Sequence, residues 1–288
     1  MEFALVDGKR HPPQPKLGGI CFLCGHRMIS KCGTKVLWHW AHSRRKHCDP
    51  WWENETEWHR SWKACFPEAW REQVHFDSTG EKHIADVKTP AGTVLEFQNS
   101  AISPQELHAR EKFYGNMLWI LNGATFVNQF FILGRVPAAE GEWTNDIVFF
   151  PQRHDMPGRA FWRRSENPGH EPGDMVLIHS VQEIQDEIDK YYVGHHLYDW
   201  VRPRSVWLES QSPVYIDFGG DLLWHMHMQQ FGASGLDCIQ AIRKKTLTSL
   251  HGGAYNETGE ILSAAKRRKR AGNVPDKGET EVICTRIR

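Results

Sequence analysis

The segment HIADVKTPAGTVLEFQNS, residues 83–100, constrains the fold more than any other stretch of the chain. Two short runs rich in apolar and β-branched residues flank the turn sequence TPAG, a pattern that predicts a β-hairpin. Each run carries one acidic residue, Asp86 in the first and Glu96 in the second. Because acidic residues are depleted in strands, one in each arm of the same hairpin requires an explanation.

The geometry of a hairpin would bring these two acids together. A three-residue loop at 90–92 would set Asp86 opposite Glu96 on one face of the sheet. Gln98 would share that face, because side chains alternate along a strand. Opposed carboxylates destabilise a sheet unless a cation or a proton lies between them. We therefore predict a divalent cation held by Asp86 and Glu96. The alternative is an ordinary solvated face, and the apolar residues around each acid disfavour it.

Further elements are predicted on both sides of the hairpin. The spacing of aromatic residues in DPWWENETEWHRSWKACF, residues 49–66, predicts a helix with Asp49 as its N-cap. QVHFD predicts a strand. SPQELHAREKFYG begins with the capping-box residues Ser103 and Glu106 of a second helix, and MLWILNG predicts a buried strand. The predicted order is helix, three strands, helix, strand.

Three polar residues recur at four-residue intervals in the first of these helices. Glu55, His59 and Lys63 would lie on one helix face. Taken alone, such a row is more typical of a solvated ladder of salt bridges. The acidic hairpin that follows favours a role in a site.

Cysteine and histidine crowd the region before this helix. CFLC supplies Cys21 and Cys24, and a Cys-x2-Cys turn presents two thiolates to one zinc ion. The second pair of ligands lies in WHWAHSRRKHC, where we favour His42 with either Cys48 or His39. If HWAH is a strand, its two histidines face opposite sides, which favours Cys48. A zinc site closed by four protein ligands would be structural.

Composition limits the class of protein. The chain has 288 residues, 40% hydrophobic with 13 Trp, enough for one or two folded domains. It shows neither an apolar run of membrane-spanning length nor a signal-peptide pattern, so we expect a cytoplasmic protein with no membrane partner. Seven Cys at irregular spacing favour metal ligands or buried thiols over disulfides. Because 35 basic residues balance 35 acidic ones, only local patches can indicate nucleic-acid binding.

Four regions are predicted along the chain. Residues 1–48 form a zinc-binding module and residues 49–135 form a core around the hairpin. The Gly- and Pro-rich stretch GRVPAAEGEWTN marks a boundary, after which residues 145–262 form a C-terminal α+β region. In this region SVQEIQDEIDKYY and LLWHMHMQQF are interpreted as helices, and SVWLES and PVYIDFG as strands. Residues 263–288 are predicted to be a disordered basic tail.

Together these motifs resemble the PD-(D/E)XK nuclease superfamily and, more closely, the CoiA-like competence proteins. The matching motifs are CFLC, HWAH for His-aromatic-Ala-His, ETEWH for Glu-x3-His, IADV for the first acid, and EFQNSAI for a Glu-x-Gln version of acid-x-Lys. The likeness runs from residue 21 to about residue 122, and no motif beyond residue 140 contributes. It implies a mixed α/β (α+β) fold with an αβββαβ core.

The resemblance implies a Mg²⁺-dependent deoxyribonuclease that acts on DNA in uptake, recombination or defence, alongside other proteins of those processes. Asp86, Glu96 and the backbone carbonyl of Phe97 would hold Mg²⁺ or Mn²⁺. Glu55 would supply a further acid from the helix, or Glu57 if the helix is rotated.

One residue departs from the superfamily pattern. Gln98 stands where lysine is usual, and a neutral amide can orient water but cannot stabilise phosphate by charge. His59 or Lys63 would then supply the positive charge, with Lys63 binding the substrate. The departure leaves a second interpretation, a zinc-containing DNA-binding adaptor in transformation or recombination with weak or no catalysis. The intact pair Asp86 and Glu96 favours the nuclease.

Overall fold

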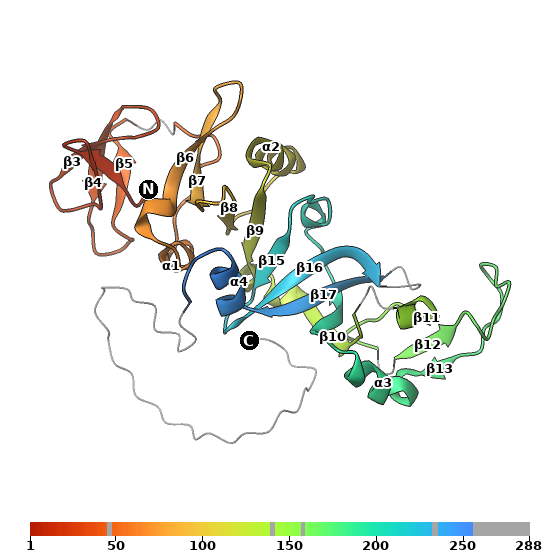
Figure 1. Cartoon of the computed structure of the whole chain (residues 1–288). Coiled ribbons are helices and arrows are strands. Elements are labelled where there is room, and N and C mark those ends of the chain that lie inside the picture. Colours follow the sequence, from red (N-terminus) through yellow and green to blue (C-terminus); the bar gives the residue numbers. More distant parts are fainter. Residues whose placement is uncertain (45–47, 139–141, 157–158, 232–235, 256–288) are drawn as a thin grey trace, which may run out of the picture. The chain divides into compact units, whose positions relative to one another are not determined.

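The computed structural model describes residues 1–44, 48–138, 142–156, 159–231 and 236–255. The described chain forms two compact units (Figure 1). The first comprises Met1–Asn122, Ser205–Tyr215 and a segment that begins at Lys244, and the second comprises Gly123–Arg204 and Ile216–Arg243. Both are built mainly of β-sheet with a few short helices, so the predicted mixture of α and β structure is confirmed. None of the described helices has the length and apolar character needed to cross a membrane.

The first unit begins with a five-stranded antiparallel sheet in the order β2-β1-β3-β4-β5. Strand alternation in β4 turns Met28 into the core of the sheet and leaves Arg27 and Lys31 exposed. Trp40 packs in the same core, against Gly19, where an added Cβ would lie 3.1 Å from its ring. The strands are β1 (Ala4–Val6), β2 (Lys9–His11), β3 (Gly18–Ile20), β4 (Arg27–Lys31) and β5 (His39–His42).

Helix α1 (Glu57–Ala64) begins later than predicted. Thr56 is its N-cap: the Thr56 hydroxyl accepts the backbone N–H of His59 at 3.3 Å, and the His59 ring accepts the N–H of Thr56. Asp49 instead accepts the N–H groups of Trp51 and Ile84, so the prediction that it caps this helix was wrong. The segment from residue 49 to the N-cap is held by these bonds rather than by helical ones.

The elements after α1 follow the predicted order. They are β6 (Arg71–Phe76), β7 (Lys82–Lys88), β8 (Val94–Gln98), α2 (Pro104–Tyr114) and β9 (Met117–Asn122). β6, β7 and β8 form an antiparallel meander, and α2 carries the chain back so that β9 pairs with β8 in parallel. The hairpin loop closes at Thr89 and Thr93, which leaves the predicted three residues at its tip. The Ser103 hydroxyl caps α2, whereas the Glu106 side chain binds Arg110.

The second unit contains a sheet in the order β10-β14-β17-β16 and a separate three-stranded sheet, β11-β12-β13. Its core includes Ile147, Phe161 and Leu197. The elements are β10 (Phe130–Arg135), β11 (Ile147–Phe149), β12 (Ala160–Arg163), β13 (His179–Ser180), α3 (Gln185–Lys190), β14 (His195–Trp200), β16 (Leu222–Phe231) and β17 (Leu236–Arg243). The chain also forms β15 (Val214–Asp217) and α4 (Lys244–Leu250).

Two predictions for the C-terminal region were wrong. LLWHMHMQQF is the strand β16, which pairs along its length with β17, and SVWLES begins with the short 3-10 helix Ser205–Leu208. The predicted strand in PVYIDFG is confirmed as β15, and Ser180 forms a capping box with Glu183 as expected. The predicted basic tail, residues 263–288, lies outside the described residues.

Candidate functional site

A pocket in the first unit is lined by charged side chains from α1, from the segment before it, from β6, from the β7–β8 hairpin and from α2. Trp51, Trp52, Ile84 and Phe97 provide apolar parts of its wall. The charged and titratable residues that line it are Asp49, Glu53, Glu55, His59, Lys63, Glu72, Asp86, Glu96 and Arg110.

The two hairpin acids lie together, as the register of the strands requires. Val87 pairs with Leu95, and continuing this antiparallel register by one residue sets Asp86 opposite Glu96. Each carboxylate accepts a backbone N–H from the other strand. Glu96 Oε1 lies 3.1 Å from the Asp86 nitrogen, and Asp86 Oδ2 lies 3.0 Å from the nitrogen of Phe97. The geometry predicted for this pair is therefore confirmed.

The electrostatic balance of the pair includes cations that the hairpin pattern did not predict. Burial, with the added charge of Asp86, raises the pKa of Glu96 to about 8, although Arg110 opposes the shift. Arg110 Nη1 lies 3.1 Å from Glu96 Oε2. Burial also raises the pKa of Asp86, against the lowering effects of Lys63 and His59. The protein thus offsets part of the repulsion between the acids with its own cations.

Glu53 is a pocket residue that the sequence patterns missed. Its Oε1 lies 2.6 Å from His59 Nε2, and its Oε2 accepts a hydrogen bond from the Ser100 hydroxyl. The Gln98 amide nitrogen lies 3.4 Å from the same Glu53 Oε2. The sequence patterns do not indicate Glu53, because it precedes α1 and so does not take part in the helical spacing of polar residues. Recognising Thr56 as the N-cap would have shown that the acids before it are not on the helix.

Both ring nitrogens of His59 are engaged within the protein. Nδ1 lies 2.9 Å from the Thr56 hydroxyl, and Nε2 faces Glu53. Burial lowers the pKa of His59, but Glu53 and Asp86 outweigh it and raise the pKa above its ordinary value. His59 therefore links the N-cap of α1 to Glu53 and orients the Glu53 carboxylate.

Lys63 lies at the centre of a buried network of ion pairs. It is 3% exposed, and its Nζ contacts both Glu55 and Glu72, with 3.0 Å to the Glu72 oxygen. Glu55 also pairs with Arg60. These carboxylates outweigh the effect of burial and raise the pKa of Lys63. Of the two alternatives for the further acid, Glu55 lines the pocket, whereas Glu57 is exposed and lies outside its lining.

We expect Lys63→Met to lower the free energy of unfolding by about 3–5 kcal/mol, because it leaves Glu55 and Glu72 buried without their shared cation. Chemical denaturation measures the change. Lys112→Met, on the exposed side of α2, is the matched control and should have an effect below about 0.5 kcal/mol. Equal stabilities for the two variants would show that the network does not depend on Lys63.

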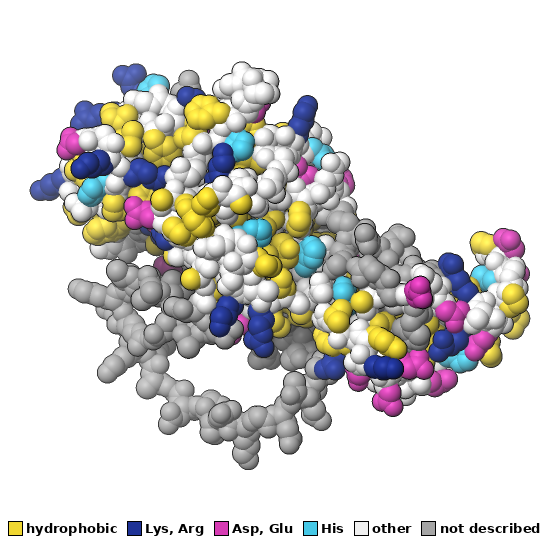
Figure 2. All heavy atoms as spheres, in the orientation of Figure 1, with side chains coloured by type: hydrophobic (Ala, Val, Ile, Leu, Met, Phe, Trp, Pro, Cys, Tyr) yellow, Lys and Arg dark blue, Asp and Glu magenta, His cyan; other side chains and the backbone are white. Residues whose placement is uncertain are grey.

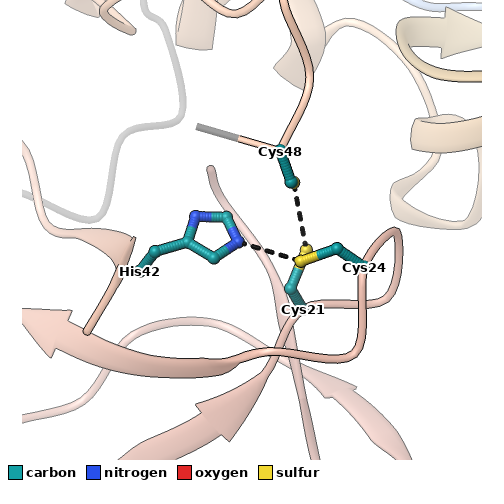
Figure 3. A group of neighbouring side chains, drawn as sticks. All are labelled: Cys21, Cys24, His42 and Cys48. Carbon is teal, nitrogen blue, oxygen red and sulfur yellow. Dashed lines mark hydrogen bonds between the residues drawn. The ribbon is translucent and has the colours of Figure 1, made fainter. Parts of the chain in front are cut away.

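A second group of side chains lies in the N-terminal sheet. Cys21, Cys24, His42 and Cys48 converge, and one ligand atom from each lies within 4.8 Å of the others (Figure 3). Cys24 Sγ is 3.3 Å from His42 Nε2, and Cys21 Sγ is 3.7 Å from Cys48 Sγ. Across the described parts of the chain, no other set of three or more Cys, His, Asp or Glu side chains converges in this way.

The local backbone explains this convergence. Gly25 adopts a φ of 73°, which lets the chain turn back after CFLC, and the Cys21 N–H donates to the His26 carbonyl at 2.9 Å. The hydrogen bond from Cys48 lowers the pKa of the Cys21 thiol to about 4. Three sulfurs and one imidazole are ligands that zinc prefers, so the cluster could hold a structural metal such as zinc. His39 lies outside the set, with its Nδ1 2.8 Å from the Leu37 carbonyl, which resolves the predicted choice in favour of Cys48.

Comparisons with known proteins do not add a family. No family model, no curated protein and no solved structure matches the chain. The chemistry of the pocket and of the Cys/His cluster therefore has to carry the functional inference. The cluster gathers thiolates and one imidazole, which suit an ion such as zinc, whereas the pocket gathers carboxylates together with cationic side chains of the protein.

Proposed function

We propose that the protein is a metal-dependent DNA nuclease of CoiA-like type, which hydrolyses phosphodiester bonds in DNA. The observation that carries the proposal is the pair Asp86 and Glu96, set opposite each other in a pocket that holds further acids. Opposed, largely buried carboxylates are costly to maintain, so a binding role accounts for them better than a purely structural one.

The donor set at this pair fits magnesium or manganese. Mg²⁺ prefers oxygen ligands and is commonly bound by one or two carboxylates together with water and substrate phosphates. Asp86 and Glu96 would supply the carboxylates, and the carbonyl of Phe97 would be a third oxygen. Such an ion lowers the pKa of water and stabilises negative charge on a phosphate. Water molecules and a substrate phosphate would complete the coordination, as is usual for Mg²⁺.

Other residues of the pocket, together with Gln98 and Ser100 outside its lining, would orient and hold these groups. Glu53, fixed by His59 and Ser100, presents a carboxylate close to the Gln98 amide. In the proposed reaction, Glu53 and Gln98 orient the attacking water. Glu55 stays bound to Lys63, so Lys63 acts by keeping this acid in place and by adding positive charge near Asp86.

Supercoiled plasmid provides the test. Protein with Mg²⁺ or Mn²⁺ should convert it to nicked or linear DNA, and EDTA should stop the conversion. Single-stranded and linear duplex DNA should be tried in parallel, because the pocket does not specify the form of the substrate. Absence of cleavage of every DNA form with both ions would refute the nuclease.

One observation favours a second candidate, a zinc-containing DNA-binding adaptor in transformation or recombination with weak or no catalysis. Both oxygens of Glu96 already have protein partners, the Asp86 N–H and Arg110. A site fixed in this way can persist as a structural feature after catalysis is lost. DNA binding without cleavage in the plasmid experiment would identify the adaptor.

A further inference from the structure

The overall neutrality of the chain hides a strong local asymmetry. Residues 1–48 contain nine Lys and Arg against only two acidic residues, a formal charge of +7. The remaining 240 residues have 26 basic and 33 acidic residues, a formal charge of −7. One metal and its four ligands would change the charge of the N-terminal module only slightly. Its surface is therefore strongly positive.

Six of these cations are exposed in the described part of the module, and none of the six pairs with an acid. Arg27 and Lys31 project from the outer face of β4, opposite to the face that buries Met28. In the described parts of the chain, none of the module's exposed cations lies within ion-pair distance of a carboxylate. Figure 2 shows dark blue side chains gathered over this part of the molecule. The exposed cations are Lys9, Lys16, Arg27, Lys31, Lys35 and Arg44.

An exposed aromatic ring lies in the loop between β4 and β5. Trp38 is 44% exposed, and its Nε1 donates to the Gly33 carbonyl at 3.1 Å, so the ring is held in place while remaining accessible. Lys31, at the end of β4, and Lys35 lie in the segment that leads to it. Exposed cations without acidic partners, followed along the chain by an exposed aromatic ring, are the features with which proteins bind single-stranded nucleic acid.

The geometry points to the outer face of β4 and the 33–38 loop as a binding surface for a single strand of DNA. We propose that Arg27, Lys31 and Lys35 bind successive phosphates and that a base stacks on Trp38. Four residue steps along β4 separate Arg27 from Lys31 by about 13 Å, enough to span more than one phosphate. The inference rests on the proposed function for its substrate and extends it by naming the surface that holds the strand.

A covalent and hydrogen-bonded path links this surface to the acid pocket. The Trp38 carbonyl accepts a hydrogen bond from Arg60 Nη1 at 2.9 Å, and the other terminal nitrogen of Arg60 binds Glu55, which lines the pocket. Arg60 belongs to α1, the helix that also carries His59. A strand held at Trp38 therefore lies beside the helix that forms one wall of the pocket.

Binding to a fluorescein-labelled 20-nucleotide single strand, measured by anisotropy without divalent ions, tests the surface. The variant Arg27→Gln/Lys31→Gln/Lys35→Gln should bind about tenfold or more weakly at 50 mM NaCl. The slope of log affinity against log salt should fall by about 2, since each phosphate contact to a single strand contributes about 0.7. Trp38→Ala should weaken binding by about tenfold with little change in that slope.

The matched control removes the same charge elsewhere, in Lys112→Gln/Lys190→Gln/Arg202→Gln, all exposed. It should retain the wild-type salt slope, and thermal unfolding and zinc content should be unchanged in both triple variants. Equal weakening in the control, or an unchanged slope in the Arg27 triple variant, would overturn the inference. So would binding to phosphatidylserine vesicles without binding to the oligonucleotide. The binding experiment does not depend on cleavage, so its outcome is separate from that of the nuclease. If binding follows the predicted pattern but the protein does not cut DNA, the proposed nuclease is refuted and the proposed binding surface is not.

Discussion

Asp86→Asn and Glu96→Gln should each reduce the rate of DNA cleavage by about 10³-fold or more. Each substitution removes one negative charge from the proposed ion and keeps the shape of the side chain. A metal that polarises a phosphate contributes several kcal/mol to transition-state stabilisation, and about 4 kcal/mol corresponds to 10³ in rate. Cleavage of supercoiled plasmid over a range of Mg²⁺ concentrations measures the loss.

The fold of both variants should survive, because Arg110 keeps its pair with Glu106 when Glu96 becomes Gln. Asn at position 86 keeps an oxygen that can accept the Phe97 N–H, and Gln at position 96 keeps one for the Asp86 N–H. Thermal unfolding and zinc content check this. Asp77→Asn makes the same chemical change in the β6–β7 turn, where Asp77 accepts N–H groups from Thr79 and Glu81, and it should cleave at the wild-type rate. Cleavage at the wild-type rate by Asp86→Asn would show that Asp86 does not bind the metal ion used in the reaction.

The parts of the site that the sequence predicted depend on short-range patterns. The register of a hairpin follows from its loop length, so the pairing of Asp86 with Glu96 could be derived from a few consecutive residues. Local patterns also predict most of the Cys/His cluster. CFLC forms a local turn that presents two cysteines, and strand alternation in HWAH places His39 and His42 on opposite faces.

The missed features depend on contacts between distant segments. Arg110 reaches Glu96 from α2, a helix whose position over the sheet is set by the parallel pairing of β8 and β9. Glu53 contacts His59 because the chain between Asp49 and α1 is not helical. Asp49 binds the β7 backbone at the start of this segment. No local periodicity encodes such contacts. The local pattern of LLWHMHMQQF likewise predicts a helix, but pairing with β17 outweighs that pattern and makes the segment the strand β16.

Loss of a cluster ligand should have the largest effect on the stability of the N-terminal module. We expect purified wild-type protein to contain about one zinc per chain, and Cys48→Ser or His42→Ala to lose most of it. Small zinc modules draw much of their folding free energy from the metal, about 10–16 kcal/mol of binding in isolated peptides. The module's core is small and includes the ligand Cys21 beside Met28 and Trp40, so it cannot compensate fully. Elemental analysis and thermal unfolding measure the two effects.

Two matched controls separate the ligands from their neighbours. Cys32→Ser and His39→Ala change residues of the same type in the same module, outside the cluster, and should keep the zinc. Zinc retained in His42→Ala but lost in His39→Ala would show that His39, and not His42, binds the metal.

The effect of losing zinc should reach the acid pocket through β1. The N–H groups of Glu2 and Phe3, which lead into that strand, donate to the Glu72 carboxylate at 2.7 and 3.0 Å. Glu72 in turn shares Lys63 with Glu55. If the module unfolds, Glu72 loses both donors, and a buried carboxylate that loses its hydrogen bonds is destabilised. We therefore expect Cys48→Ser to lower DNA cleavage as well as stability, although no cluster ligand lines the pocket. Full cleavage by zinc-free, partly unfolded protein would show that the pocket is stable without the module.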